Sequence, residues 1–429
     1  MSVVQIGLLL LASFFLMLAL SVPVSISLIV SSLITVSTAL PLDLGTFVAC
    51  QKMVAGVDSF SLLAVPFFIL TGVLMNTGGI AQRLINLAKC LVGRIPGGLA
   101  HTNIVGNTMF GALSGSAVAA SIAVGGVMLP EEEAAGYDKK FAAAANVASA
   151  PTGLIIPPSG ILIIYAVLSG SSVVGMIMSG YIPGILWCLA CMVVAFIVAK
   201  KNKYPTSERV PVKVLFRYFV EAIPSILLIV IIIGGISSGI FTATESAAVA
   251  VAYTLFLAMV VYKSIKPSDL PGILRDACET TAVIMFLIAA SAVMSFVLSF
   301  TGLPNAIGEA LLSVSDNKYI ILLLINLLLL VAGMFMDITP AVLIFAPIFL
   351  PVVTSFGMDP IHFGIMMVVN LAIGFVTPPI GVNLFVASSL TKVPVMDIAK
   401  KAIPMILLFL VALLLITYIP AISTCLIGG

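Results

Sequence analysis

Two apolar stretches of this sequence are interrupted in the same way. Residues 153–160 are GLIIPPSG and residues 374–381 are GFVTPPIG, so that Gly374 follows Gly153 at an offset of 221 residues. Each proline removes a backbone donor and clashes with the preceding turn, so a regular helix does not continue through a proline pair. Both stretches are therefore predicted to be broken helices, and the fold must hold two of them in equivalent places.

The same offset relates positions over much of the chain, which makes the repeat longer than a local motif. Thr77-Gly78 also matches Thr301-Gly302 once a small gap is allowed. A frame of this length predicts two homologous halves, residues 1–205 and 211–429. The ungapped matches are Pro130 with Pro351, Asp138 with Asp359, Pro157-Pro158 with Pro378-Pro379, Gly160 with Gly381, and Pro183 with Pro404.

Composition indicates whether these halves lie in water or in a membrane. The chain is 61% hydrophobic and 8% charged, and its mean hydropathy is +1.28. Its apolar runs continue for about 17–25 residues without alternation, which indicates membrane-spanning helices and not a barrel. We therefore expect an all-α polytopic membrane protein without a soluble domain. The net charge of +2 gives no indication of nucleic-acid binding.

The apolar segments predict ten transmembrane helices and two re-entrant hairpins. The spans are 3–20, 22–40, 60–76, the broken run 141–169 and 181–199, then 214–233, 243–262, 278–300, the broken run 362–390 and 402–421. The segments within 98–130 and within 319–355 are short and joined without a charged loop, which favours a hairpin in each half. Five crossings per half make the halves inverted repeats, as in many secondary transporters.

Basic residues orient this arrangement. With the N-terminus outside, every lysine and arginine except Lys52 and Lys318 falls on the inside. That asymmetry is what the positive-inside rule demands, and it places both termini on the outer side of the membrane.

The proline pairs and the hairpin tips supply candidate chemistry. The prolines should leave carbonyls of Gly153, Leu154, Gly374 and Phe375 without donors, and free carbonyls at membrane depth suit a sodium ion. The second half of each broken helix begins near Ser159 or near Ile380, and its free N–H groups suit a carboxylate. Polar side chains stand at the tips and before the second proline pair: Ser114, Ser116, Asp337, Thr339 and Thr377.

Simpler interpretations exist for each feature. A proline pair can be a tolerated kink, and the tip serines can be small packing residues, since Gly111 and Gly115 form a GxxxG spacing. One polar tip beside one broken helix in each half favours two ion sites with a substrate site between them. Elsewhere, Trp187 is expected as an outer-interface anchor, and Glu132 is expected in a solvated inner loop with its charged neighbours.

Enzyme signatures are missing. The sequence has no GxxxxGK[ST] or HExxH motif, and two histidines are too few for a histidine-based centre. We therefore expect a protein that is not an enzyme. An intramembrane enzyme or assembly scaffold that uses Asp337 is the alternative from another class, and an acid without a partner argues against it.

Three stretches resemble the large membrane subunit of the tripartite ATP-independent periplasmic (TRAP) transporters. They are HFGIMMVVNLAIGFVTPPIGVNLFVA (362–387), PTGLIIPPS (151–159) and LSGSAVA (113–119). The resemblance extends over essentially the whole chain. It implies an elevator-type carrier of the bacterial inner membrane that takes up an organic acid anion, of the C4-dicarboxylate or sialic acid class, with Na+. It also implies a periplasmic substrate-binding protein and a small four-helix membrane subunit as partners.

The resemblance also implies site residues and domains. The first sodium site would involve Ser114, Ser116, Gly153, Ile156 and Pro158, and the second Gly333, Gly374, Thr377 and Ile380. At the 221-residue offset Gly333 falls on Ala112, so the two ion sites should differ in detail. Asp337, with Thr339 and Ser159, would lie at the substrate or a coupling ion. A stand-alone sodium–carboxylate symporter of the same superfamily remains the alternative function. The scaffold would be 1–78 with 214–302, and the transport part 97–200 with 318–425.

Overall fold

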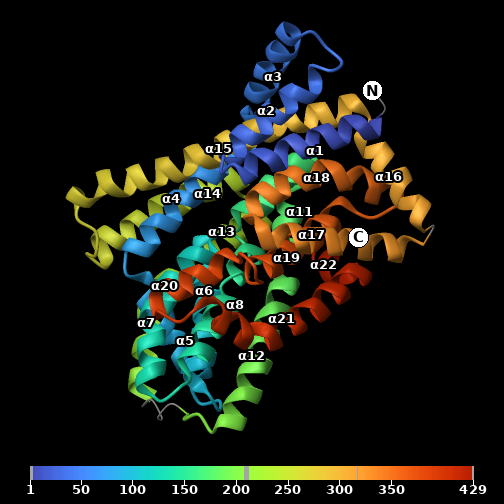
Figure 1. The fold of residues 1–429 in the computed structure, drawn as a ribbon. Helices are drawn as coiled ribbons and strands as arrows, with labels where there is room; N and C mark the ends of the chain where they lie inside the picture. Colours follow the sequence, from blue (N-terminus) through green and yellow to red (C-terminus); the bar gives the residue numbers. More distant parts are fainter. Residues whose placement is uncertain (1–2, 207–211, 316, 428–429) are drawn as a thin grey trace.

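The computed structural model describes residues 3–206, 212–315 and 317–427, and every regular element within these ranges is a helix (Figure 1). The connector between the two predicted halves includes residues 207–211, which lie outside the described residues. The apolar helical composition thus gives the fold class that the sequence predicts.

The first half begins with a group of helices that ends in an amphipathic one. These are α1 (Val3–Ala19), α2 (Val24–Val36), α3 (Leu42–Val57), the 3-10 turn η1 (Phe60–Leu63), α4 (Ala64–Thr77) and α5 (Ile80–Val92). The hairpin and the broken helix follow. These are α6 (Gly98–Ser114), α7 (Ala117–Ala134), α8 (Lys139–Ser149), α9 (Thr152–Ile155), α10 (Gly160–Ser169), α11 (Val173–Ser179) and α12 (Tyr181–Asn202).

The second half has the same order of parts. Its first group is α13 (Val212–Ser237), α14 (Ala243–Phe256), the π-helical turn η2 (Leu257–Val261), the 3-10 turn η3 (Pro267–Asp269), α15 (Leu270–Thr301) and α16 (Leu303–Val314). The rest is α17 (Lys318–Phe335), α18 (Ile338–Ser355), α19 (Pro360–Phe375), α20 (Val382–Thr391), α21 (Val395–Tyr418) and α22 (Ala421–Thr424).

Helix α3 is the element that the sequence did not predict. Its polar residues, such as Gln51 and Lys52, interrupt the apolar pattern that identified the spans. With η1 and α4 it occupies the place that the continuous helix α15 occupies in the second half, because Thr77 and Thr301 end these two stretches. One half therefore breaks the helix that the other half keeps whole.

Helix length gives fewer spans than the pattern did. Within the described residues, eight helical stretches are long and apolar enough to cross a membrane, or nine if α8–α9 and α10, bent by 43°, count as one. Helices α1 and α2 and the two parts of the second broken helix are too short for this criterion, whereas both arms of the second hairpin meet it. The expected ten crossings with two hairpins therefore stay a prediction.

Packing brings the two halves together around their breaks. Helix α14 packs on α4, while α2 and α3 pack on α15, and each hairpin lies against the broken helix of its own half. The second part of each broken helix also crosses to the other half, since α10 packs on α18 and α20 packs on α7. Both hairpin tips are thereby brought towards one region in the middle of the molecule (Figure 1).

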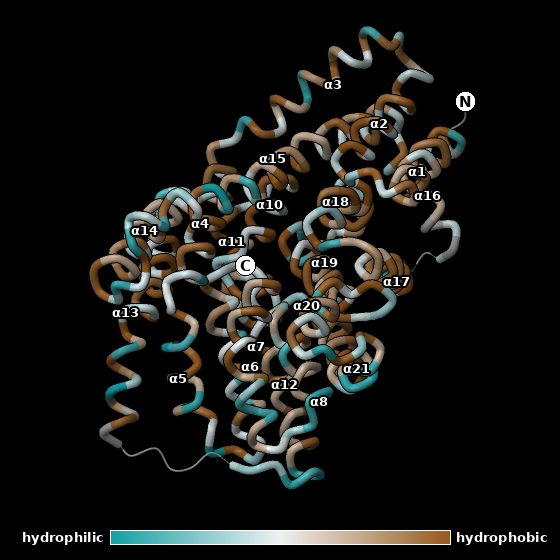
Figure 2. The backbone as a smooth tube through the Cα atoms, turned by 60° about the vertical axis from the view of Figure 1, so that its left-hand side comes forward, coloured by the Kyte–Doolittle hydropathy of each residue, from teal (hydrophilic) through white to brown (hydrophobic). Residues whose placement is uncertain are grey.

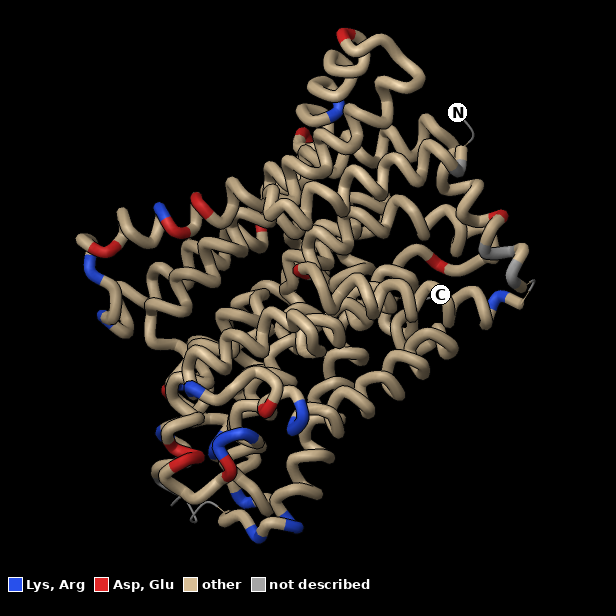
Figure 3. Tube along the Cα trace, viewed as in Figure 1, with Lys and Arg blue, Asp and Glu red and all other residues tan. Residues whose placement is uncertain are grey.

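Most basic residues gather on one side of this assembly. Lysines and arginines concentrate along the lower and left ends of Figure 3, and the hydropathy colouring of the turned view in Figure 2 shows polar residues at the lower ends of α5, α8 and α13. There Lys140 pairs with Asp397 at 2.8 Å and Lys401 with Asp138 at 2.7 Å, joining the starts of α8 and α21. Partial burial opposes ionisation of Asp138, but the bonds from Lys401 and the Lys140 backbone hold its pKa below the usual value.

Two side chains that the sequence placed at surfaces are buried, so those predictions were wrong. Trp187 is 1% exposed. Its indole Nε1 donates to the Ala148 carbonyl at 2.8 Å, and its ring stacks on Phe409. Glu132 is fully buried and accepts a hydrogen bond from the Asn103 amide at 3.2 Å. In each case long-range packing supplies a polar partner that local sequence does not reveal.

Candidate functional site

The first hairpin tip is a turn between two helices. Helix α6 ends at Ser114, and Gly115 takes a left-handed conformation with φ 62°, which favours glycine. Ser116 then caps α7, because its hydroxyl oxygen accepts from the Ala119 N–H at 3.3 Å. The sequence Ser-Gly-Ser thus reverses the chain while it keeps two hydroxyls at the turn.

This tip rests on the first broken helix. A Cβ built on Gly153 would lie 2.5 Å from the Cα of Gly111, so the two backbones are in direct contact. Next to it, a Cβ on Gly115 would lie 3.2 Å from the carbonyl oxygen of Pro158. Backbone atoms of the tip and of the break therefore face each other without side chains between them.

The second tip has a carboxylate cap in place of a hydroxyl. Asp337 begins α18, and its Oδ1 accepts from the Ile338 N–H at 2.7 Å. The second break reaches back to this hairpin, because the Ile380 N–H donates to the Met334 carbonyl at 3.3 Å. Tip and break are again joined through backbone atoms.

A glycine pair marks the equivalent contact in each half. Gly374 lies against Gly333, where an added Cβ would come within 2.6 Å of the Gly333 Cα. Gly153 meets Gly111 in the same way, so Gly111, and not Ala112, is the structural counterpart of Gly333. The strict offset of 221 is therefore wrong by one residue at this position, because the helix before the tip shifts its register while the breaks stay aligned.

Fewer backbone carbonyls are free than the prolines alone predict. The Ser159 hydroxyl donates to the Leu154 carbonyl at 2.6 Å, and the Thr377 N–H donates to the Gly374 carbonyl at 3.0 Å. Two of the four carbonyls that were expected to lack a donor therefore accept hydrogen bonds from residues beside the prolines. The carbonyls that keep no donor within the described residues, one in each break, are those of Gly153 and Phe375.

A cavity of about 470 Å³ lies where the two tips meet helices α4 and α15. The starts of α7, α10 and α18 all open onto it, and the free N–H groups at such starts favour an anion. Its polar lining combines tip residues with residues from α4 and α15: Ser114, Ser116, Asp337, Thr339, Asn76, Asp276 and Thr280.

The charges of this cavity have one sign. Asp337 and Asp276 line it, and no lysine, arginine or histidine is among the described residues of its wall. A carboxylate cargo would be repelled by two carboxylates at short range unless cations were bound beside it. The helix N-termini favour an anion, and the two acids have no basic residue beside them in the described wall. Together these groups suit joint binding of an anion and cations.

The predicted site residues fall into two groups. Ser114, Ser116, Asp337 and Thr339 line the cavity. The others lie at the breaks behind it, where Gly153 and Pro158 meet the first tip and where Gly333, Gly374 and Ile380 join the second tip to its break. Three side chains are engaged elsewhere: Ile156 packs against Gly184 of α12, Ser159 bonds Leu154, and Thr377 donates to the Ile373 carbonyl at 2.6 Å.

The sequence did not predict the part of the cavity wall that α4 and α15 contribute. Asp276, Thr280 and Ile284 line the cavity from successive turns of α15, and Asn76 does so from the end of α4. The i, i+4 spacing of Asp276 and Thr280 puts two polar groups on one face of a mostly apolar helix. That spacing was the available signal, but only the packing of α15 shows that this face meets the tips.

Comparison with known proteins identifies the family. A family model described as "Tripartite ATP-independent periplasmic transporter, DctM component" matches residues 11–422. The chain belongs to this family. As a TRAP large membrane subunit, it is related to transporter permeases and not to enzymes.

Relatives of this TRAP subunit cover nearly its whole length. It is 50% identical to the "Uncharacterized protein YgiK" of Salmonella typhimurium (96% of this chain, 94% of the relative). It is 41% identical to the C4-dicarboxylate TRAP transporter large permease protein DctM of Pseudomonas aeruginosa (86% of each). It is 40% identical to the sialic acid TRAP transporter large permease protein SiaM of Vibrio cholerae (87% of each).

A solved structure supports the fold. The YdaH transporter of Alcanivorax borkumensis is similar with a TM-score of 0.62 over 85% of this chain and 86% of that chain. The two sequences are 13% identical, so the likeness concerns the fold alone.

Proposed function

We propose that this TRAP subunit carries an organic acid anion across the bacterial inner membrane together with Na+. The observation that carries the proposal is the cavity of helix starts and acids at which both hairpin tips meet. The names of related proteins, which include C4-dicarboxylate and sialic acid permeases, support a carboxylate cargo.

Sodium fits the groups at the breaks. The Gly153 and Phe375 carbonyls and the tip hydroxyls are hard oxygen donors, the kind that unwound transporter helices offer to Na+. Close glycine pairs let two backbones approach, so that oxygens from a tip and a break can share one ion. We assign the first site to Ser114, Ser116, Gly153, Ile156 and Pro158, and the second to Gly333, Gly374, Thr377 and Ile380.

The proposed movement is that of an elevator built from two inverted repeats. The transport part, 97–200 with 318–425, carries both tips and both breaks, and the scaffold, 1–78 with 214–302, supplies the fixed wall of α4 and α15. The side rich in lysine and arginine would face the cytoplasm and both termini the periplasm, which agrees with the positive-inside rule. A small membrane subunit and a periplasmic binding protein would complete the system, as membership of the family implies.

The test is uptake by the complete system in proteoliposomes, with a cargo found by screening carboxylates against the binding protein. We expect uptake to require Na+. The double variant Ser116→Ala, Thr377→Ala should raise the sodium concentration for half-maximal uptake about fivefold, since each substitution removes from its own site one polar contact worth roughly 1 kcal/mol. The readout is the initial rate of labelled cargo uptake against sodium concentration.

A matched control separates this effect from loss of helix caps. In Ser172→Ala, Thr391→Ala, one serine caps α11 and one threonine bonds the preceding turn of α20, as in the test pair, but outside the proposed sites. This control should keep the sodium dependence of the unmodified system. Uptake that does not depend on the Na+ concentration would contradict sodium coupling. Uptake by this chain without the binding protein would instead favour a stand-alone symporter.

A further inference from the structure

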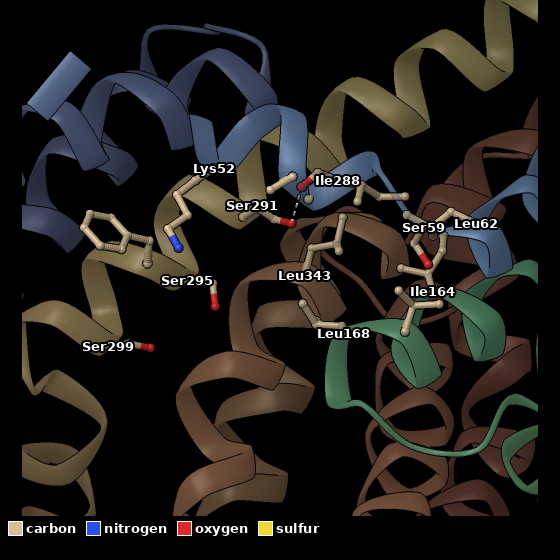
Figure 4. Close-up of a pocket in the computed structure, with 15 residues that line it drawn as sticks. Lys52, Ser59, Leu62, Ile164, Leu168, Ile288, Ser291, Ser295, Ser299 and Leu343 are labelled. Atoms are coloured by element: carbon tan, nitrogen blue, oxygen red, sulfur yellow. Dashed lines mark hydrogen bonds between the residues drawn. The ribbon is translucent and has the colours of Figure 1, made fainter. Parts of the chain in front are cut away.

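A second cavity, of about 480 Å³, lies between α3 and α15 on one side and α10 and α18 on the other (Figure 4). It adjoins the cavity of the two tips, because the buried side chain of Ile164 lines both. Nothing in the assigned sodium or substrate sites uses it, and its polar groups differ in kind from those of its neighbour.

A lysine reaches this cavity from α3. The α3 backbone is in close contact with α15, since a Cβ on Gly56 would overlap the Ala292 side chain. Lys52 lies one turn before Gly56 on the same face, and its Nζ is 5.4 Å from the centre of the Phe296 ring. No acidic group pairs with Lys52 among the described residues. The lysine therefore places an uncompensated positive charge at the cavity wall (Figure 4).

Two hydroxyls on α15 complete the polar wall. The Ser291 hydroxyl is occupied, because it donates to the Ile288 carbonyl at 2.8 Å. Ser295 and Ser299, one and two turns further along, line the same cavity, and their hydroxyls have no hydrogen-bond partner within the described residues (Figure 4). An ammonium with two free hydroxyl donors is a set that suits a carboxylate.

The two cavities share one face of α15. Thr280 and Ile284 line the tip cavity, and Ile288 and Ser295 line the second one. Thr280 and Ser295 are about 22 Å apart along the helix at 1.5 Å per residue. The apolar side chains of Ile284, Ile288 and Ile164 lie between the two polar ends, so they separate the polar parts of the two cavities along one line.

We propose that the second cavity is a receiving site for the carboxylate of the anionic cargo on the outer side of the membrane. Lys52 and the Ser295 and Ser299 hydroxyls would hold the anion before it passes to the tips. The inference rests on the proposed function and orientation, in which α3 and Lys52 face outwards. An unpaired lysine on a solvated helix would require no ligand, so the experiment measures whether the cavity itself concentrates anions.

The first arm measures the electrostatics of the cavity without transport. Ser295→Cys is introduced after the six native cysteines are replaced, and the complete complex is treated from outside with an anionic methanethiosulfonate (sulfonatoethyl) and a cationic one (trimethylammonioethyl). We expect the anionic reagent to react faster with this cysteine than the cationic reagent does. Adding Lys52→Ala should lower the anionic-to-cationic rate ratio about three- to tenfold, because one charge at the wall focuses small ions.

The matched control is Lys318→Ala. Lys318 also lies over an aromatic ring, 5.3 Å from the centre of Tyr319, but it does not line this cavity. It should leave the ratio unchanged. An unchanged ratio in Lys52→Ala, or a cysteine that does not react at all, would overturn the proposal.

The second arm tests the carboxylate. Millimolar succinate or N-acetylneuraminate, whichever the binding protein accepts, should slow the anionic reagent in vesicles of phosphatidylcholine alone, and Lys52→Ala should remove that protection. Protection that depends on phosphatidylglycerol and not on the carboxylate would assign the cavity to a lipid headgroup and overturn the proposal. If these results hold but the unmodified complex shows no sodium-driven uptake, the proposed function fails while the anion site stands.

Uptake then connects the cavity to transport. Lys52→Ala should raise the cargo concentration for half-maximal uptake about fivefold with little change in the maximal rate, as removal of an early electrostatic attraction does. Lys52→Arg, which keeps the charge, should restore the concentration dependence, and unchanged uptake in Lys52→Ala would contradict a role in receiving cargo.

Discussion

Gly153→Ala and Gly374→Ala, made singly, are each expected to lower uptake by the complete system at least a hundredfold. The added methyl group of the first would lie 2.5 Å from the Cα of Gly111, and that of the second 2.6 Å from the Cα of Gly333. Both neighbours are backbone atoms of a packed helix, so they cannot move aside by rotating a side chain. A tip displaced by about 1 Å from its break loses the shared ion site, and misplacement of that size costs about a hundredfold in rate.

Gly126→Ala is the matched control for this prediction. Gly126 lies inside α7 of the first hairpin, and a Cβ there would meet no atom within 4 Å. Alanine should be neutral or stabilise the helix by roughly 0.5–1 kcal/mol. Initial uptake rates and thermal unfolding of the purified subunit give both quantities. Normal uptake in Gly153→Ala and Gly374→Ala would show that the close glycine contacts do not support function.

Asp337→Asn is expected to raise the sodium concentration for half-maximal uptake at least tenfold, a loss of about 1.4 kcal/mol in sodium binding. Asp337 carries its charge at the second tip, and the cavity wall offers no cation to compensate it within the described residues. A bound Na+ would relieve the repulsion between this carboxylate and an anionic cargo. The amide keeps the oxygen that accepts from the Ile338 N–H, so the helix cap survives while the charge is removed.

Asp276→Asn provides the comparison on the opposite wall. Asp276 lines the same cavity from α15, which belongs to the proposed scaffold and would not travel with the ions. Its amide variant should change the sodium dependence less than threefold. The measurement is the sodium concentration for half-maximal uptake in the two variants. Equal increases in the two variants would mean that the charge acts through the general field of the cavity and not at a moving ion site.

Much of the architecture was predictable because it depends on short-range rules. Proline chemistry predicted both broken helices, at 153–160 and 374–381, and polar tips after apolar segments predicted both turns. The structure brings each break against a turn, with Gly153 against Gly111 and Gly374 against Gly333. The sodium assignments and the elevator movement remain predictions for the experiments above.

The predictions that were wrong depended on partners distant in the sequence or on exact register. Ala112 was matched with Gly333, but Gly111 makes the contact, because an offset cannot follow a one-residue shift in a helix. Carbonyls thought to be free are bonded by Ser159 and by the Thr377 N–H, since residues next to a proline can turn back to satisfy it. Glu132 is buried although its neighbours are charged, because Asn103 on the facing arm supplies a partner.

The sequence by itself determined the class of protein and the two places where the chain must open, because apolar length and proline geometry act locally. Only the tertiary structure decided which surfaces face those openings. Helix α15 contributes Asp276 to one cavity and Ser295 to the next along a single face. A helix pattern shows that such residues share a face, but what that face meets is set by how distant helices pack.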